Sequence, residues 1–426
     1  MTHSPSDPQS SDVVLGGNGP APNQGAILGG IEGIRQKLNH PDLTLRLEAL
    51  DQAWSYGDAG RVCLEQALGD RSKTIRRRAH WLLRQPKGTP RPHLPVWDLA
   101  ERLGGYLGYS GQHVTHFAKR DVREFQAGQA LSNPQQTAYA LRSGYDDDND
   151  GGTSIDAQLD ALLDTAGSEQ VEALVFGAWN RDEDFFTGED SSQELVEQLA
   201  SLSNRLPNLK ALFIGDITSE ECEVSWLTQS DMSPILQAYP QLEVLQVRGG
   251  MGLKFEPSEN AVHKHLKALI LETGGLSRET VTQIYEWDFP ALEHLEFWFG
   301  SEHYGGDCWE QDLAPILNEL VFPNLTYLGL RNSQFADELI DRLIGSPLLA
   351  GLQVLDLSMG TLSDEGAAKL LEYWEISNLE ILNVSESYLS GATIDQLQAL
   401  GIQVIADDQR SIEDEYDDGR YCAVSE

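Results

Sequence analysis

Apolar residues recur along the second half of the chain in the pattern LxxLxL, in which each L is leucine or another large apolar residue. Eight copies are clear, and they begin at Val171, Leu209, Leu242, Leu266, Leu292, Leu325, Leu352 and Leu379. From the second copy onward, successive first positions differ by 33, 24, 26, 33, 27 and 27 residues. A recurrence of this kind is typical of a repeat architecture, and the two longer units indicate insertions.

Segments with helical spacing of apolar residues separate the copies. They cover residues 191–202, 280–287, 337–344, 365–374 and 394–400. Each unit is therefore predicted to consist of a strand, a turn and a helix. Because one such unit cannot bury its own apolar face, neighbouring units must stack, which predicts a curved α/β solenoid with a parallel sheet on its inner face.

This pattern resembles the leucine-rich-repeat superfamily, in particular the ribonuclease-inhibitor-like horseshoes, over residues 171–405. The resemblance implies parallel strands on the concave face and helices outside. The ninth position of each unit, typically Asn or Cys in that family, is here Gly250, Gly274, Gly300, Ser333, Gly360 and Ser387. The block 113–145, an acidic hinge and the opening VEALVFGAW are similar to a group of uncharacterised bacterial leucine-rich-repeat proteins, a similarity that implies architecture and no activity.

The first third of the chain carries a different, weaker repeat. Two stretches align at a 30-residue offset, with Leu45, Arg46, Ala49 and Ala53 against Ile75, Arg76, Ala79 and Leu83. This resembles a short run of HEAT-like helical repeats. The predicted division of the whole chain is a disordered tail (1–26), a HEAT-like helical domain (27–90), a mixed connecting and capping segment (91–145), an acidic hinge (146–155), the leucine-rich-repeat domain (156–406) and an acidic disordered tail (407–426).

Charge distinguishes the two halves. The chain has 30 Lys and Arg against 67 Asp and Glu, and residues 143–426 hold 54 of these acids but only 13 of the bases. An acidic surface repels nucleic-acid phosphates and anionic lipid and attracts cationic partners. The expected partner is therefore a protein with a basic or mixed surface, not nucleic acid or membrane. The alternative is that the Asp and Glu residues serve only to keep a large apolar repeat array soluble.

The N-terminal third carries a dense basic cluster, which consists of Arg71, Lys73, Arg76, Arg77, Arg78 and Arg84. It lacks the interleaved aromatic residues of a nucleic-acid footprint, so a solvated helix face is favoured. In an alternative interpretation, these helices are the functional part of the protein, and the acidic half covers Arg76–Arg78.

Four cysteines lie far apart without a CxxC pair, no signal-peptide pattern opens the chain, and no run of 18 apolar residues occurs. These features predict a soluble protein of the reducing cytoplasm.

One short motif suggests a metal. Asp146, Asp148 and Asp150 precede Gly151 as in the DxDxDG opening of a calcium loop. The closing position is Ala157 instead of glutamate, so a solvated acidic hinge is favoured over a calcium site. Two histidine pairs have a spacing that suits zinc but lack a third ligand nearby, His113 with His116 and His263 with His265.

No serine elbow, phosphate loop or dinucleotide turn occurs in the chain, so it is predicted not to be an enzyme. The alternative is a divalent-metal-dependent module or an enzyme that uses carboxylates of the loops and the hinge.

Residues between the repeat leucines are predicted to point to the concave face. That face is apolar in its first repeats and becomes polar and aromatic from His294 onward. The candidate partner-binding residues there are Arg248, His294, Glu296, Trp298, Tyr327, Arg331 and Asp356. For the apolar end, the alternative is that the chain's own preceding segment covers it.

The loops that leave the strands are long in three units, at 180–190, 216–231 and 299–312, and lie on one rim of the predicted solenoid. Their aromatic residues stand among acids and are candidates for partner contact: Trp179, Phe185, Phe186, Trp226, Tyr304 and Trp309. The alternative is that they fold back on the solenoid edge. Together these patterns predict a non-catalytic protein–protein interaction scaffold or adaptor.

Overall fold

The computed structural model describes most of the chain in two compact units, Met1–Pro92 and His93–Glu426. The described residues are 30–41, 43–54, 56–68, 70, 75, 79, 82–83, 112–142, 154–179, 190–319, 321–322, 324–411 and 419–424. The basic cluster, the acids Asp146, Asp148 and Asp150, and Phe185 with Phe186 lie outside them. Within the described residues, no helix has the length and apolar character needed to span a membrane.

The first unit is helical, as predicted. Its described helices are α1 (Gly30–Leu38), α2 (Leu43–Trp54) and α3 (Gly57–Ala67). Leu50, Ala53 and Leu64 are buried in its core. A β-carbon at Gly60 would lie 1.7 Å from the main-chain oxygen of Ala53, so α2 and α3 approach each other as closely as they do because residue 60 is glycine. The HEAT-like character of this unit stays a prediction.

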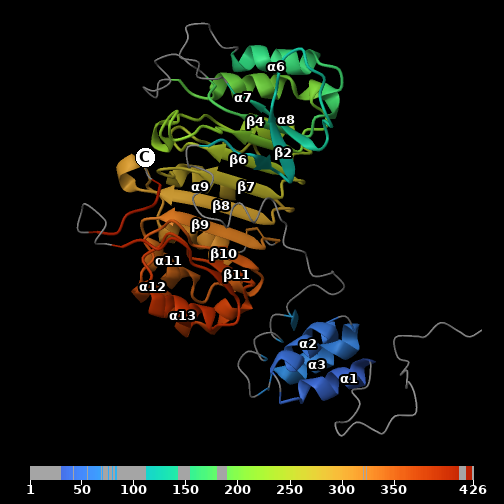
Figure 1. Ribbon diagram of the computed structural model, residues 1–426, viewed down its shortest axis with the longest axis vertical. Coiled ribbons are helices and arrows are strands. Elements are labelled where there is room, and N and C mark those ends of the chain that lie inside the picture. Colours follow the sequence, from blue (N-terminus) through green and yellow to red (C-terminus); the bar gives the residue numbers. More distant parts are fainter. Residues whose placement is uncertain are drawn as a thin grey trace, which may run out of the picture. The chain divides into compact units, whose positions relative to one another are not determined.

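The second unit is built on one sheet of twelve strands in the described residues, and the strands follow one another in sequence order (Figure 1). They are β1 (His116–Phe117), β2 (Arg120–Glu124), β3 (Thr137–Leu141), β4 (Ala173–Phe176), β5 (Ala211–Ile214), β6 (Val244–Arg248), β7 (Ala268–Glu272), β8 (His294–Gly300), β9 (Tyr327–Ser333), β10 (Val354–Asp356), β11 (Ile381–Asn383) and β12 (Gln403–Ile405). The pair β1–β2 is antiparallel, whereas β2 to β12 pair in parallel. Each connection thus returns the chain beside the strand it has just left, which is the topology of a solenoid.

Helices alternate with the strands along the chain. They are α6 (Ile155–Asp164), α7 (Gln193–Ser201), α8 (Ser233–Ala238), α9 (Arg278–Tyr285), α10 (Ala314–Glu319), α11 (Ala336–Leu343), α12 (Asp364–Glu372) and α13 (Gly391–Gln398). Serine caps start several of them: the Ser277 hydroxyl accepts from the Thr280 amide, and the Ser390 hydroxyl accepts from the Thr393 amide. The five helical segments predicted from sequence are confirmed, with small differences at their ends.

The repeat leucines form the core between the sheet and the helices. Leu212, Leu245, Leu269, Leu295 and Leu328 are paired in register from strand to strand and fully buried. Burial of one such side chain contributes roughly 1.5–3 kcal/mol, so this column alone stabilises the array strongly. The sequence analysis placed the start of the repeat domain at residue 156. The sheet begins earlier in the chain, at β1 and β2.

The turns that follow the strands use the left-handed backbone region. Gly300 has φ +65°, and a β-carbon there would lie 1.8 Å from the main-chain oxygen of Gly274. In later repeats the same region is occupied by residues with side chains, at Asn332 (φ 51°), Met359 (φ 68°) and Glu386 (φ 52°). This conformation is costly for a residue such as methionine, so the surrounding repeats must hold these turns in place.

Candidate interaction surfaces

The strand faces opposite the leucine core carry a cluster of polar side chains in the middle of the array, formed by His294, Glu296, Tyr327, Arg331 and Asp356 and called here the polar cluster. One Glu296 oxygen accepts from Arg331 at 3.0 Å. The Tyr327 hydroxyl donates to Asp356 at 3.0 Å and lies 3.3 Å from Glu296. The rings of His294 and Tyr327 stack with their centroids 3.8 Å apart. One cation and one hydroxyl thus link two carboxylates of different repeats.

Two neighbouring side chains, Trp298 and Asn383, also donate hydrogen bonds to the carboxylates of this cluster. The Trp298 indole nitrogen donates to Glu296 at 2.7 Å, and the Arg331 guanidinium lies over the Trp298 ring at 5.1 Å. The side-chain amide of Asn383 donates to Asp356 at 3.0 Å. A carboxylate can be buried where cations and donors surround it, and this arrangement supplies both.

A second buried ion pair lies two repeats earlier. Arg248 donates to Glu272 at 2.8 Å, and Gln246 donates to the other oxygen of Glu272 at 2.9 Å. Arg248 also donates to the main-chain oxygen of Ile217 at 2.8 Å and lies over the ring of Phe213 at 5.3 Å. It therefore connects the sheet to the rim loop that begins after β5.

These geometries correct one expectation. The sequence placed seven candidate residues on an open concave face, and all seven are buried: Arg248, His294, Glu296, Trp298, Tyr327, Arg331 and Asp356. Strand alternation assigned them to the right face, because none of them belongs to the leucine core. Burial of the charged members is tolerated because their charges compensate one another between repeats, a relationship that alternation alone does not reveal.

The apolar end of the same face is covered by the chain's own residues 112–118, called here the N-terminal arm. Val114 and Phe117 pack with Val175, Phe213 and Val244 in one apolar cluster. The rings of Phe117 and Phe213 lie with their centroids 5.9 Å apart. The alternative that a preceding segment covers this end is confirmed.

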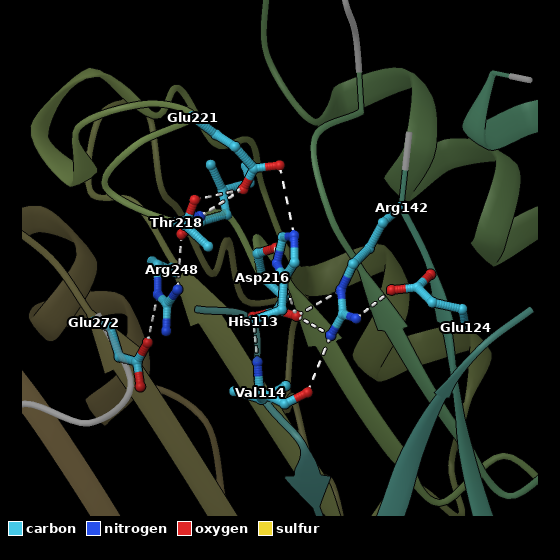
Figure 2. A network of polar contacts seen from close by, with 10 residues as sticks. His113, Val114, Glu124, Arg142, Asp216, Thr218, Glu221, Arg248 and Glu272 are labelled. Carbon is cyan, nitrogen blue, oxygen red and sulfur yellow. Dashed lines mark hydrogen bonds and ion pairs between the residues drawn. The ribbon is translucent and has the colours of Figure 1, made fainter. Parts of the chain in front are cut away.

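A polar network fixes the arm to the rim (Figure 2). Asp216, fully buried after β5, accepts from the Val114 amide at 3.2 Å and from Arg142 at 2.9 Å. The His113 ring contacts the main-chain oxygen of Asp216 at 3.0 Å and lies 3.6 Å from a Glu221 oxygen. Arg142 bonds Glu124 as well. The network thus joins the arm, β2, the end of β3 and the rim loop.

The charges in this network shift two pKa values. Burial by itself would raise the pKa of Asp216, but the His113 hydrogen bond and the Arg142 and Arg248 charges outweigh it, so the pKa lies below its usual value. Burial by itself would lower the pKa of His113, but the bond to Asp216 and the nearby carboxylates raise it above its usual value. The pair is therefore stabilised in its charged form.

The histidines of the two pairs contact other groups of the protein. His113 contacts Asp216, whereas His116 lies 3.1 Å from Asp121. His263 contacts the Tyr239 carbonyl with one ring nitrogen and accepts from the Leu266 amide with the other. In the described part of the chain, no group of three or more His, Cys, Asp or Glu is arranged to hold a metal.

The rim loops lie at the carboxyl ends of the parallel strands, and one of them exposes a large aromatic side chain. Trp226, at the end of the turn Val224–Trp226, is 48% exposed, although Val224 and Ser225 beside it are buried. Met251, 47% exposed, lies on the next rim loop, which bridges to Thr228. Trp226 and Met251, the rim patch, therefore stand on adjoining loops.

The other described rim aromatics are less exposed. Trp309 packs on Phe335 with ring centroids 5.6 Å apart, and both Trp309 and Trp179 pack against the core. Tyr304 is half-buried. The alternative that loop aromatics fold back on the solenoid thus holds for Trp309 and Trp179, and not for Trp226.

The last residues of the chain also depart from expectation. The tail 407–426 was predicted to be disordered, but residues 419–424, called here the C-terminal segment, pack on the array. Val424 is buried with Val224, Trp298 and Met359. The prediction is therefore wrong for this segment. The acid-rich composition around it hid three apolar residues, Cys422, Ala423 and Val424.

The in-register leucines and the strand–turn–helix units make the second unit a leucine-rich-repeat solenoid, as the sequence predicted. A structural-genomics protein from Bacteroides fragilis is similar to it, at 28% identity over 62% of this chain and 72% of that one, with a TM-score of 0.57.

More distant structures are an internalin from Listeria monocytogenes (14% identity, 58% of this chain and 56% of that one, TM-score 0.31) and the TLR13–ssRNA13 complex (17% identity, 60% and 34%, TM-score 0.30). Neither is close enough to inform on a site. No protein-family model matches the chain, and a search of curated proteins finds no match.

Proposed function

We propose that this protein is a non-catalytic interaction scaffold that binds a partner protein through the rim patch. The observation that carries the proposal is the half-exposed indole of Trp226, which stands on an otherwise buried turn beside the exposed Met251. Tryptophan is the residue most enriched in the energetic centres of protein interfaces, and methionine adapts to the shape of its partner. Most large apolar side chains described in this unit are buried, and the exposure of these two on adjoining loops supports a binding surface here.

The charge around the patch favours a partner with a basic or mixed surface. Glu220 is exposed and Glu223 is half-buried on the same loop as Trp226. The chain as a whole has 67 acidic against 30 basic residues, which disfavours nucleic acid and anionic lipid as partners. We place the scaffold in the reducing cytoplasm, because Cys222, Cys308 and Cys422 are buried as free thiols.

The polar cluster has a different role in this proposal. Its side chains are buried and bond one another and their neighbours, so in this proposal they hold the middle repeats in register and do not contact the partner. The adaptor surface is thus the rim, and the inner face is its rigid support.

The test is capture from native cell extract with the full chain and two matched variants. Trp226→Ala removes the rim indole. Val262→Ala removes a side chain that is 46% exposed, on the segment that precedes β7 and bridges to Asp288. We expect a salt-sensitive partner to be lost with Trp226→Ala and retained with Val262→Ala, while both variants melt at the wild-type temperature. Equal capture by the two variants would contradict the proposal.

A further inference from the structure

The C-terminal segment is held by contacts to several repeats, and its main hydrogen bonds are to those of β8, β9 and β10. The Asn332 side-chain oxygen accepts from the Val424 amide at 2.9 Å, and its side-chain nitrogen donates to the Val424 carbonyl. The Ala423 amide donates to the main-chain oxygen of Met359 at 2.8 Å. The Cys422 thiol donates to the Gly300 carbonyl at 3.4 Å. In Figure 1 the chain end lies beside the ends of β8 and β9.

Most of these hydrogen bonds are made to main-chain atoms of the C-terminal segment. The carboxamide of Asn332 bonds both the amide and the carbonyl of one residue, as the edge of a strand does. Bonds of this kind recognise an extended peptide whatever its sequence, while side-chain pockets provide the specificity. Asn332 and Met359 both hold left-handed backbone conformations, which are often found where a structure clamps a ligand.

Two side-chain contacts add specificity. Val424 packs with Val224, Trp298 and Met359, and these three residues are fully or almost fully buried beneath it. Four residues earlier, Arg420 donates to Asp337 at 2.7 Å. Val224, Trp298, Asn332, Asp337 and Met359 are called here the docking surface. Asp337 binds the basic residue, and the other four accept the β-branched residue that follows it by four positions.

We infer that the docking surface is a recognition site for an extended peptide with a basic residue and, four positions later, a β-branched apolar residue. In this chain its own C-terminal segment occupies the site, and a partner protein with a segment of this chemistry displaces it. The inference does not rest on the rim patch, although Val224 belongs to the same loop as Trp226.

The tether explains why a partner must compete for the site. Because the segment belongs to the same chain as the site, its docking is intramolecular, and such linkage commonly corresponds to an effective concentration on the order of millimolar. A free peptide of the same affinity must therefore reach about the same concentration to displace half of it. A partner that also contacts the rim gains the advantage of two linked contacts.

Cys422 reports on the state of the site in the full chain. It is buried in the docked segment, and burial raises the pKa of its thiol to about 12. Cys308, buried among the residues of the leucine core, is the internal control. The modification rate of each thiol by a maleimide is measured from its tryptic peptide by mass spectrometry.

The competitor is a synthetic peptide of residues 417–426 with Cys422→Ser. We expect Cys422 in the wild-type chain to react faster than Cys308, and its rate to rise at least severalfold, with saturation, as the peptide reaches millimolar concentration. The same peptide with Val424→Asp should have no effect. In the chain with Asn332→Ala, loss of two hydrogen bonds should raise the unassisted Cys422 rate roughly tenfold and leave Cys308 unchanged.

Two results would overturn the inference. If Cys422 reacts at the rate of Cys308 and responds to neither peptide nor Asn332→Ala, the segment is a fixed part of the core. If dilution of the protein alone accelerates Cys422, the segment belongs to a second copy of the chain. Trp226→Ala should leave the response to the peptide unchanged, so this test and the capture experiment fail independently.

Discussion

The hydroxyl of Tyr327 lies 3.0 Å from a carboxylate oxygen of Asp356, its neighbour in the next repeat. The same hydroxyl lies 3.3 Å from Glu296 in the preceding repeat, so one proton serves two buried carboxylates. This contact links three successive units through side chains, in addition to the main-chain bonds of the sheet. The stability of the middle repeats therefore depends on a few polar atoms as well as on the leucines.

Replacing Tyr327 by Phe tests this dependence. The variant keeps the ring that stacks on His294 and loses only the hydroxyl. Because two buried carboxylates lose a donor, we expect the free energy of unfolding to fall by about 1–3 kcal/mol. Urea denaturation followed by circular dichroism measures it. Tyr421→Phe, at an exposed ring, is the control and should change the value by less than about 0.5 kcal/mol.

The buried pair Arg248–Glu272 should be costly to break. In Arg248→Met, Glu272 keeps its buried charge without its cation, and we expect a loss of about 3–5 kcal/mol in urea denaturation. Lys369→Met removes a cation from a pair with Asp341 that is largely exposed to solvent, so the loss should be much smaller. Similar losses in the two variants would show that burial does not govern the pair.

Stability should require glycine at position 300 for two reasons that can be separated: its left-handed backbone conformation and the close approach of the Gly274 oxygen. Gly300→Ala adds a left-handed alanine and a contact of 1.8 Å with the Gly274 oxygen. Gly305→Ala, with φ +86° and open space around the new atom, adds the backbone cost alone. We expect a loss of about 1–2 kcal/mol for Gly305→Ala and a clearly larger one for Gly300→Ala, measured by thermal melting. Equal losses would mean that the turn relaxes around the new atom.

The attachment of the N-terminal arm should depend on pH. The pKa of His113 is raised in the folded state, so its protonated form stabilises the fold. This contribution is fully present below the unfolded pKa of about 6.5 and is lost as pH rises through the folded value. Asp216 behaves in the opposite sense: its pKa is lowered, so its contribution is lost only as pH falls through that lowered value.

His113→Gln is the variant that measures the effect. The difference in free energy of unfolding between wild type and variant should be larger at about pH 6 than at alkaline pH, above the raised pKa of folded His113. His116→Gln, at an exposed ring paired with Asp121, is the matched control. A difference that does not vary with pH would show that His113 acts only through its shape.

Sequence periodicity was sufficient for the repeat architecture and for the face of each strand. Leu295 and Leu328 were assigned to the core, and His294 and Tyr327 to the opposite face, because side chains in a strand alternate. Periodicity could not show that Glu296 and Arg331, 35 residues apart, neutralise each other. That pairing depends on side-chain geometry across strands, and it decides whether the inner face is open or buried.

The loops and the chain end were harder to predict for a different reason. Trp226 and Trp309 stand in similar acidic loops, yet one is exposed and the other packs on Phe335, because the fold of each loop decides this. The C-terminal segment is too short to show any periodicity. Its sequence indicated packing in one way, because three apolar residues, Cys422 to Val424, follow an acid-rich stretch.

In an array whose units contact only their neighbours, the last repeats can unravel one at a time from the end. The bonds between Val424 and Asn332 join residues 92 positions apart, and so close a ring around the repeats of β9 to β12. The last strand, β12, is therefore held between the sheet and this closure, and its separation from β11 is restrained until the closure opens. Release of the C-terminal segment would therefore convert an all-or-none transition of these repeats into stepwise fraying.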